Sequence, residues 1–172
     1  MWPARQPDTK QKKNDCQELA AGAKSLAENT LAPVLKATND PRSAVDTFMS
    51  SLARTYTEFP SANPIEIFAV NQGWLPAQAS SSFRDSGFAP GFRDGSNQVR
   101  HAAGGLLAGY NLGAQAGLSY MNSRENPNDP ADMPDIRLNG QTVPKGAELA
   151  GPRGYAAAAQ LGEWVNGTLC GK

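Results

Sequence analysis

One glycine decides how the longest stretch of small and apolar residues in this chain can fold. Gly113 lies in the middle of residues 97–125, which also contain His101, the only histidine. If these residues form one helix, His101 and Glu125 are separated by roughly 36 Å, at about 1.5 Å per residue. If Gly113 ends a first helix in the left-handed conformation that glycine tolerates, the two halves fold back as an antiparallel hairpin. The hairpin would place His101 and Glu125 side by side, because both are equally far from Gly113 in the sequence.

We favour the hairpin, and the continuous helix remains the alternative. Four glycines recur at a spacing of four, which is typical of a smooth helix face that packs closely against another helix: Gly105, Gly109, Gly113 and Gly117. Glycine inside a helix nevertheless costs about 1 kcal/mol relative to alanine.

Apolar side chains at three- and four-residue spacing predict helices before this stretch. A first helix is expected over residues 14–29 and a second over 44–56, with Ser43 as the N-cap of the second. Pro33 is expected to interrupt the hydrogen-bond ladder, so that residues 31–36 form a separate turn.

The segments after the central stretch are shorter. Residues 126–135 are acidic and rich in proline, which predicts a loop. Residues 135–146 are expected to form one short helical turn followed by a turn at Asn139-Gly140, with a β-hairpin as the alternative. A last amphipathic helix is expected from Tyr155 to Cys170-Gly171.

Two regions show little periodicity. Residues 1–12 are polar and predict a disordered arm. Residues 57–96 are irregular, and within them 65–71 fit either a helical turn or a short strand. Four aromatic residues are expected to anchor this connection: Trp74, Phe83, Phe88 and Phe92. We therefore expect residues 13–172 to form a single, mainly α-helical domain of about five or six helices, with long irregular connections and a central helical hairpin.

Charge and hydropathy exclude several classes of partner. The chain carries 16 basic and 16 acidic residues, so bulk attraction to nucleic acid or to anionic membranes is not expected. No apolar run approaches the roughly 20 residues of a membrane span. No signal-peptide pattern is visible at the start, so a secreted protein would already have lost its signal.

Composition and cysteines favour an exported bacterial protein, secreted or periplasmic, although a cytoplasmic location remains open. Charged residues make up 19% of the chain, below the roughly 25% typical of soluble domains. Cys16 and Cys170 lie near opposite ends, and a disulfide between them would stabilise the fold by roughly 4–5 kcal/mol. The alternative is two separate thiols in a reducing compartment.

The chemistry-bearing residues gather around the central stretch. The chain has no CxxC, HExxH, P-loop or GxSxG motif and no dinucleotide-binding fingerprint, so no cofactor is expected. A histidine opposite a glutamate on a hairpin can act as an acid/base pair, because the carboxylate raises the basicity of the imidazole. An aspartate from the following segment could complete a metal site or position a water molecule. The candidate catalytic residues are Arg100, His101, Glu125, Asp135 and Asn139; the alternative is a buried polar network without chemistry.

Residues 97–146 resemble the helix-rich "RH…HE…NN" domains of bacterial secreted and polymorphic-toxin-type proteins. The matching residues are Arg100-His101, Leu112-Gly113, Glu125, Asp135, Asn139 and Gly146. Arg124 stands where the family has the histidine before its glutamate. The resemblance implies the helical hairpin and an exported, toxin-like bacterial context.

Two functions therefore compete. The first is a small exported effector-like or hydrolase-like domain, with His101 as general base, Glu125 as its partner and Arg100 or Arg124 stabilising an anion. Asp135 and Asn139 would then position water or metal. The second is a non-enzymatic module that packs a protein partner through the glycine row and the aromatic connection.

Overall fold

The computed structural model describes residues 13–78 and 82–172, and the predicted disordered arm at residues 1–12 lies outside them. The fold is mainly α-helical, as the periodicity predicts, and no β-strand is present in these ranges. The helices are α1 (Asp15–Thr38), α2 (Pro41–Tyr56), α3 (Pro64–Asn71), α4 (Gln98–Asn122), α5 (Met133–Ala150), α6 (Gly154–Ala159) and α7 (Leu161–Thr168), with a short 3₁₀ helix, η1 (Pro90–Phe92). None of the described helices is long and apolar enough to cross a membrane.

The first helix is longer than predicted. α1 continues through Pro33 to Thr38, so the separate turn expected at residues 31–36 is wrong. Pro33 and Asn29, whose carbonyl oxygen loses its helical partner, are both exposed. The hydrogen bond that Pro33 cannot donate to Asn29 is therefore lost on the solvent-facing side of the helix. Buried side chains such as Leu31 pack the opposite side against the core.

The second helix begins earlier than predicted. Its N-cap is Asp40, whose side chain accepts a hydrogen bond from the backbone N–H of Arg42, and Pro41 occupies the first turn. Asp followed by Pro is a favourable helix start, because proline has no N–H to leave unpaired there. Ser43 is not the cap; its hydroxyl donates to Asp40.

The predicted hairpin forms within α4. Gly113, with φ 79° and ψ 173°, breaks the helix into two arms, residues 98–112 and 114–122. The arms pack antiparallel, since Gly104 faces Met121 and Gly117 faces Ala108. A reversal at this point excludes the continuous-helix alternative.

The segment after the hairpin differs most from prediction. Residues 133–150 form one helix, α5, which runs through Asn139-Gly140 and through Pro144. The predicted turn at Asn139-Gly140 and its β-hairpin alternative are both wrong. α5 packs tightly on α4: a Cβ added at Gly109 would overlap the Val143 carbonyl, and one added at Gly146 would overlap the Leu106 carbonyl. This tertiary contact overrides the local turn preference.

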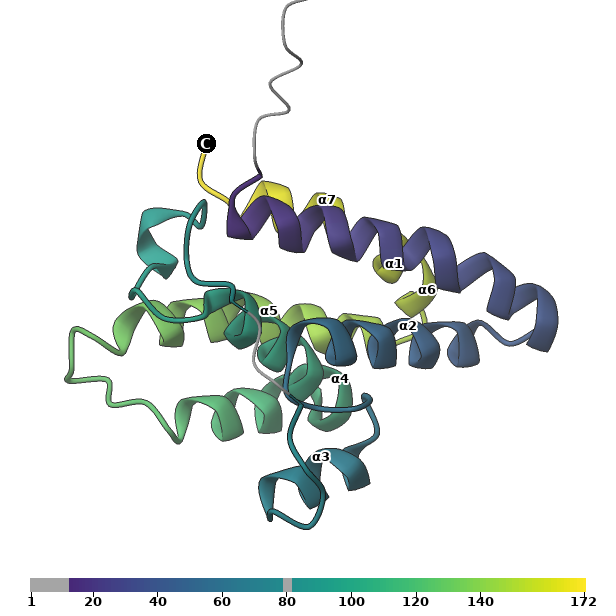
Figure 1. Ribbon diagram of the computed structural model, residues 1–172, viewed down its shortest axis with the longest axis horizontal. Helices are drawn as coiled ribbons and strands as arrows, with labels where there is room; N and C mark the ends of the chain where they lie inside the picture. The colour runs from purple at the N-terminus through teal and green to yellow at the C-terminus, as the bar shows by residue number, and fades with distance from the viewer. Residues whose placement is uncertain (1–12, 79–81) are drawn as a thin grey trace, which may run out of the picture.

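Three of the four glycines in the row pack against other parts of the chain. Gly105 and Gly109 face α5, and Gly117 lies between Val143 and the first arm of its own hairpin. Figure 1 shows the hairpin and α5 as one half of the molecule, with α1, α2 and α7 covering the other half. The large side chains buried in the core include Leu19, Phe48, Met49, Leu52, Leu106, Leu138 and Leu161.

The C-terminal helix closes the core against α1. The single predicted helix is divided at Gln160 into α6 and α7, and Gly162 lets α7 approach the backbone of α1 at Ala20. Cys16 and Cys170 form a disulfide. The bridge joins the beginning of α1 to the segment after α7, so both ends of the described domain lie together.

The irregular region contains α3, so residues 65–71 are helical rather than a strand. The four aromatic residues predicted to anchor this region divide into two groups. Phe88 is fully buried, and Phe83 and Phe92 pack partly against the core. Trp74 is 72% exposed and does not anchor the connection.

Candidate functional site

His101 sits in the first turn of α4, where the chain enters the helix from an irregular segment. The side chain of Asn97 caps this turn by accepting a hydrogen bond from the backbone N–H of Arg100. The imidazole is mostly buried, with 17% of the side chain exposed.

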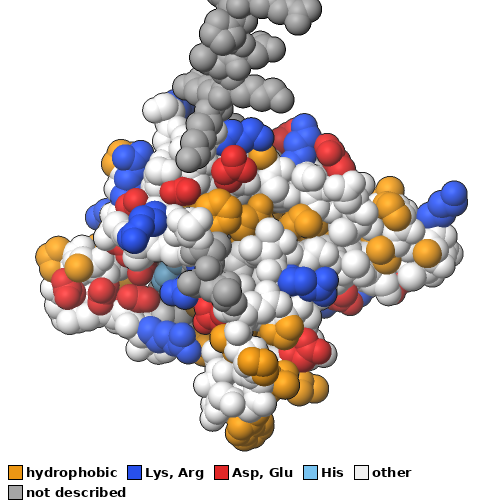
Figure 2. All heavy atoms as spheres, in the orientation of Figure 1, with side chains coloured by type: hydrophobic (Ala, Val, Ile, Leu, Met, Phe, Trp, Pro, Cys, Tyr) orange, Lys and Arg blue, Asp and Glu red, His pale blue; other side chains and the backbone are white. Residues whose placement is uncertain are grey.

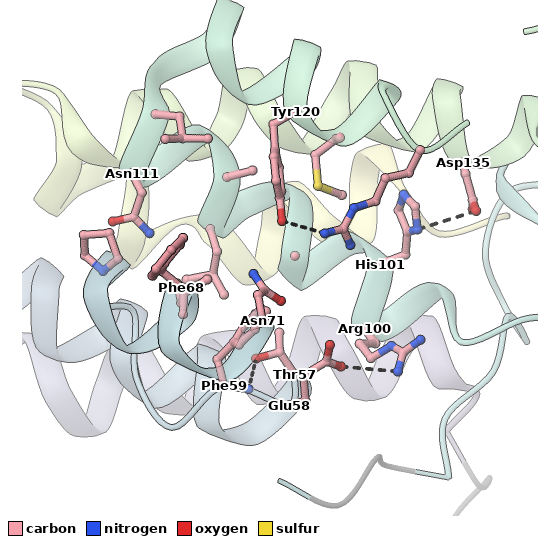
Figure 3. Close-up of a pocket in the computed structure, with 18 of the residues that line it drawn as sticks. Thr57, Glu58, Phe59, Phe68, Asn71, Arg100, His101, Asn111, Tyr120 and Asp135 are labelled. Carbon is pink, nitrogen blue, oxygen red and sulfur yellow. Dashed lines mark hydrogen bonds and ion pairs between the residues drawn. The ribbon is translucent and has the colours of Figure 1, made fainter. Parts of the chain in front are cut away.

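The hairpin and α5 bring two carboxylates to this imidazole. Glu125 follows the second arm, and Asp135 lies in the first turn of α5. One atom from each of His101, Glu125 and Asp135 lies within 4.8 Å of the others. His101 Nδ1 is 3.5 Å from Asp135 Oδ2, an interaction drawn in Figure 3. The predicted meeting of His101 and Glu125 across Gly113 is therefore confirmed.

Asn139 orients the imidazole from the other side. It lies one helical turn after Asp135 and is fully buried. Its Oδ1 atom is 2.8 Å from His101 Nε2, and its Nδ2 donates to Asn122 Oδ1 at 2.9 Å. Because the amide oxygen can only accept, Nε2 must carry the hydrogen. In the neutral ring, Nδ1 then holds the free lone pair, directed toward the carboxylates.

Gln98 orients Asp135 in the same way. Its Nε2 donates to Asp135 Oδ1 at 2.7 Å, which leaves the second carboxylate oxygen facing His101. The Gln98 side chain is completely buried, and its Oε1 has no hydrogen-bond partner among the described residues.

Burial and nearby negative charge disfavour the charged form of both carboxylates. Desolvation raises the pKa of Asp135 above its ordinary value, and Asp94 adds to this effect, while His101 and Gln98 oppose it. The pKa of Glu125 is raised first by desolvation and then by the charge of Asp135. The site thus concentrates negative charge around one imidazole.

The predicted arginine has a different place. Arg100 pairs with Glu58, with Nη1 3.3 Å from Oε2, and does not pair with the carboxylates at His101. Arg124 stacks on Tyr120, with its Cζ atom 5.1 Å from the centre of the ring, and donates a hydrogen bond to the Tyr120 hydroxyl. In the described part of the chain, no lysine or arginine pairs with Glu125 or Asp135.

The cluster lies at one end of an open cleft of about 500 Å³ between α3 and the α4 hairpin. Figure 3 shows His101 and Asp135 at one end and Asn111 with Phe68 at the other. Both arginines also line the cleft. The wall between is largely apolar and includes Phe59, Ile67, Phe68, Leu107, Leu112 and Met121. A solvent-reached polar centre beside an apolar wall is a common form of ligand site.

Sequence reasoning missed Gln98, Asn122 and Glu58. Gln98 is three residues before His101, and this spacing places both on one face of a helix. That signal was present in the sequence. The contribution of Asn122 and Glu58 depends on packing between separate elements, which no local pattern reveals.

No protein-family model matches the chain, and no curated protein or solved structure is significantly similar to it. The resemblance of residues 97–146 to the "RH…HE…NN" domains therefore stays a prediction.

Proposed function

We propose that this protein is a small exported, effector-like hydrolase in which His101 and Glu125 form the acid/base pair that activates water. One observation carries the proposal: His101, Glu125 and Asp135 converge at the polar end of an open cleft. A purely structural network would more commonly be sealed and fully paired. Here Nδ1 of the neutral imidazole is an acceptor, and it faces carboxylates, which are acceptors too, instead of a hydrogen-bond donor.

The geometry suggests the following roles. Water between Nδ1 and Glu125 gives a proton to Nδ1, and its oxygen attacks a carbonyl or phosphoryl ester bound in the cleft. Asp135 stabilises the imidazolium that forms. The imidazolium returns the proton to the leaving oxygen. Arg124, which lines the same cleft, stabilises the developing negative charge on the substrate.

The disulfide supports the exported part of the proposal. Structural disulfides persist in oxidising compartments such as the periplasm or the extracellular medium. The resemblance to secreted bacterial domains agrees with this location.

Hydrolysis can be tested with chromogenic carboxylic esters and phosphodiesters that differ in chain length. We expect His101→Ala to lower turnover at least 100-fold, the usual scale for loss of a general base, while circular dichroism remains unchanged. Glu28→Gln, an exposed carboxylate on α1, is the matched control and should retain the wild-type rate. If the wild type hydrolyses none of these substrates faster than His101→Ala, the proposed function is wrong.

A protein-interaction module is the second candidate, and exposed apolar residues on and after α3 favour it. Ile65, Phe68 and Trp74 are 76%, 53% and 72% exposed. Orange hydrophobic side chains gather over α3 at the bottom of Figure 2. Because Gly105, Gly109 and Gly117 pack against other parts of the chain, the exposed α3 patch is the surface that favours a partner.

The two candidates respond differently to substitution. A partner that docks on the α3 patch should bind wild type and His101→Ala equally and lose affinity for Phe68→Ser/Trp74→Ser. Binding to a purified candidate partner can be measured by calorimetry. Equal binding by the patch variant would contradict the interaction module.

A further inference from the structure

We propose that His101 Nδ1 and the carboxylates of Asp135 and Glu125 bind a divalent cation, of the Zn²⁺ or Mn²⁺ type, at the polar end of the cleft. This inference deepens the proposed function and rests on the same cluster. The imidazole tautomer, the hydrogen bonds behind the ligands, the local charge and the open face of the site all favour a bound cation.

The tautomer of His101 points to a cation first. Asn139 holds the hydrogen on Nε2, so the lone pair of Nδ1 faces Asp135 Oδ2 at 3.5 Å. Two acceptors in this arrangement repel each other unless something positive lies between or beside them. A proton on Nδ1 satisfies both, and so does a metal ion bound to both. Neutral imidazole nitrogen is a common ligand for such ions.

The hydrogen bonds behind two of the ligands form the support that metal sites usually have. A metal-binding histidine generally donates its other N–H to a fixed acceptor, and ligating carboxylates are hydrogen-bonded in turn. Asn139 accepts from His101 Nε2 and is itself held by Asn122. Gln98 donates to Asp135 Oδ1, and Oδ2 faces His101 Nδ1 at 3.5 Å, where the ion would bind.

The local charge also calls for a cation. The carboxylates of Glu125 and Asp135 both lie beside the His101 imidazole. The two arginines that line the cleft have other partners, since Arg100 pairs with Glu58 and Arg124 stacks on Tyr120. A bound divalent ion would neutralise the two carboxylates that the arginines do not reach.

The three ligand atoms would have to move closer together to hold an ion. Bonds of about 2.0–2.2 Å to nitrogen and oxygen place neighbouring ligand atoms roughly 3 Å apart. The three atoms here lie within 4.8 Å, so a contraction of about 1–2 Å is needed. Glu125 can supply it, because it lies in the connection beyond the end of α4 and is half-buried.

The ligand set and its exposure indicate the kind of ion. One imidazole nitrogen with two carboxylates suits Zn²⁺ or Mn²⁺, whereas sites for Ca²⁺ and Mg²⁺ use oxygen atoms. Three protein ligands leave at least one position open, and all three residues line the cleft. The open position would hold water, whose pKa the ion lowers toward neutrality.

The metal-free and the metal-bound states differ in what Nδ1 of His101 binds, which is a proton in the first and the ion in the second. In the metal-free enzyme, Nδ1 takes the proton from water itself. With an ion bound, His101 would be a ligand, and the ion would supply the acidified water in place of the imidazole base. The same cleft and substrate class serve both states.

Metal binding can be measured without any substrate. The full chain, treated with EDTA and dialysed, is titrated separately with ZnCl₂ and MnCl₂ in a calorimeter. We expect one ion per chain for at least one of these metals. Asp135→Asn and Glu125→Gln should each weaken binding at least 10-fold, and Asn139→Leu should weaken it about 10- to 100-fold through the orientation of His101. Glu28→Gln is the control and should bind as the wild type does.

Two results would overturn the site. One is a folded wild-type protein that binds neither ion at concentrations of about 1 mM. The other is wild-type affinity in both Asp135→Asn and Glu125→Gln, with circular dichroism showing that both variants fold. Glu125 is half-buried, so Glu125→Gln should disturb the fold little. This variant therefore tests the site even if Asp135→Asn does not fold.

Hydrolysis measured in EDTA separates this inference from the proposed function. Ion binding without hydrolysis of any ester supports the metal site and contradicts the hydrolase. Hydrolysis that persists in EDTA, together with no ion binding, supports the metal-free acid/base pair and contradicts the metal site.

Discussion

At the scale of single residues, the orientation of His101 depends on a buried amide. Asn139 has no exposed surface, and it uses both ends of its amide, one toward Asn122 and one toward His101. Buried amides in such chains can hold only one orientation without losing a hydrogen bond. This chain of bonds determines which imidazole nitrogen faces the carboxylates.

We predict that neutral His101 in metal-free protein carries its hydrogen on Nε2. Nitrogen-15 correlation spectra of the imidazole distinguish the two ring nitrogens directly. In Asn139→Leu the acceptor is lost, and the hydrogen should be shared between both nitrogens. A wild-type spectrum with the hydrogen on Nδ1 would show that Asn139 does not control the tautomer.

Tyr56 gives a prediction for alkaline pH. Its side chain is 5% exposed, and burial, followed by the charge of Glu18, raises its pKa from 10.0 to about 12. The folded state therefore holds the phenol proton more tightly than the unfolded state does. The resulting stabilisation is complete below pH 10 and is lost as the pH rises from about 10 to 12.

Urea unfolding at pH 9 and pH 12 measures this loss. The wild type should lose about 2 kcal/mol more than Tyr56→Phe over this interval, because the phenylalanine has no proton to release. Equal losses in both proteins would mean that Tyr56 ionises as readily in the folded protein as in the unfolded chain.

At the scale of elements, the reversal in α4 depends on the backbone of Gly113. A φ of 79° with a ψ of 173° is accessible to glycine and strained for other residues. Nothing lies within 4 Å of a Cβ added there. A substitution at Gly113 thus tests backbone conformation alone, without a steric clash.

Gly113→Ala should destabilise the protein by about 1–3 kcal/mol and weaken the contact between His101 and Glu125. Gly140→Ala is the matched control, since Gly140 lies inside α5 with nothing within 4 Å of the added Cβ. It should stabilise the fold by up to about 1 kcal/mol. Thermal and urea unfolding of both variants give the comparison. A Gly113→Ala variant as stable as the wild type would contradict the need for glycine at the reversal.

At the scale of the whole molecule, the disulfide joins the two ends of the described domain. Cys16 and Cys170 are 154 residues apart in sequence, so the bridge encloses nearly every helix. Its effect falls mainly on the unfolded chain, whose freedom it restricts. The disulfide connects the beginning of α1 with the segment after α7, and these two helices pack closely where Gly162 approaches Ala20.

Cys16→Ala/Cys170→Ala should lower the free energy of unfolding by about 4–5 kcal/mol, according to the chain-entropy relation for long loops. Dithiothreitol should destabilise the wild type by a similar amount and leave the double variant unchanged. Urea unfolding under both conditions checks this. An unchanged midpoint for the reduced wild type would contradict a stabilising role for the bridge.

Much of the architecture follows from local sequence patterns. Apolar spacing indicates the central parts of α1 and α2, and Gly113 favours the hairpin, because helix periodicity and the freedom of glycine act over a few residues. The equal spacing of His101 and Glu125 from Gly113 then brings these two side chains together. These features needed no knowledge of distant parts of the chain.

Only the tertiary structure decided the rest of the site. Asn139-Gly140 favours a turn locally, yet packing of α5 on α4 through Gly109 and Gly146 makes it helical. That helix places Asp135 and Asn139 one turn apart, on opposite nitrogens of the imidazole. The pairing of Arg100 with Glu58 likewise depends on a contact between separate elements. Local preferences are worth about 1 kcal/mol or less per residue, and the burial of a whole helix face outweighs them.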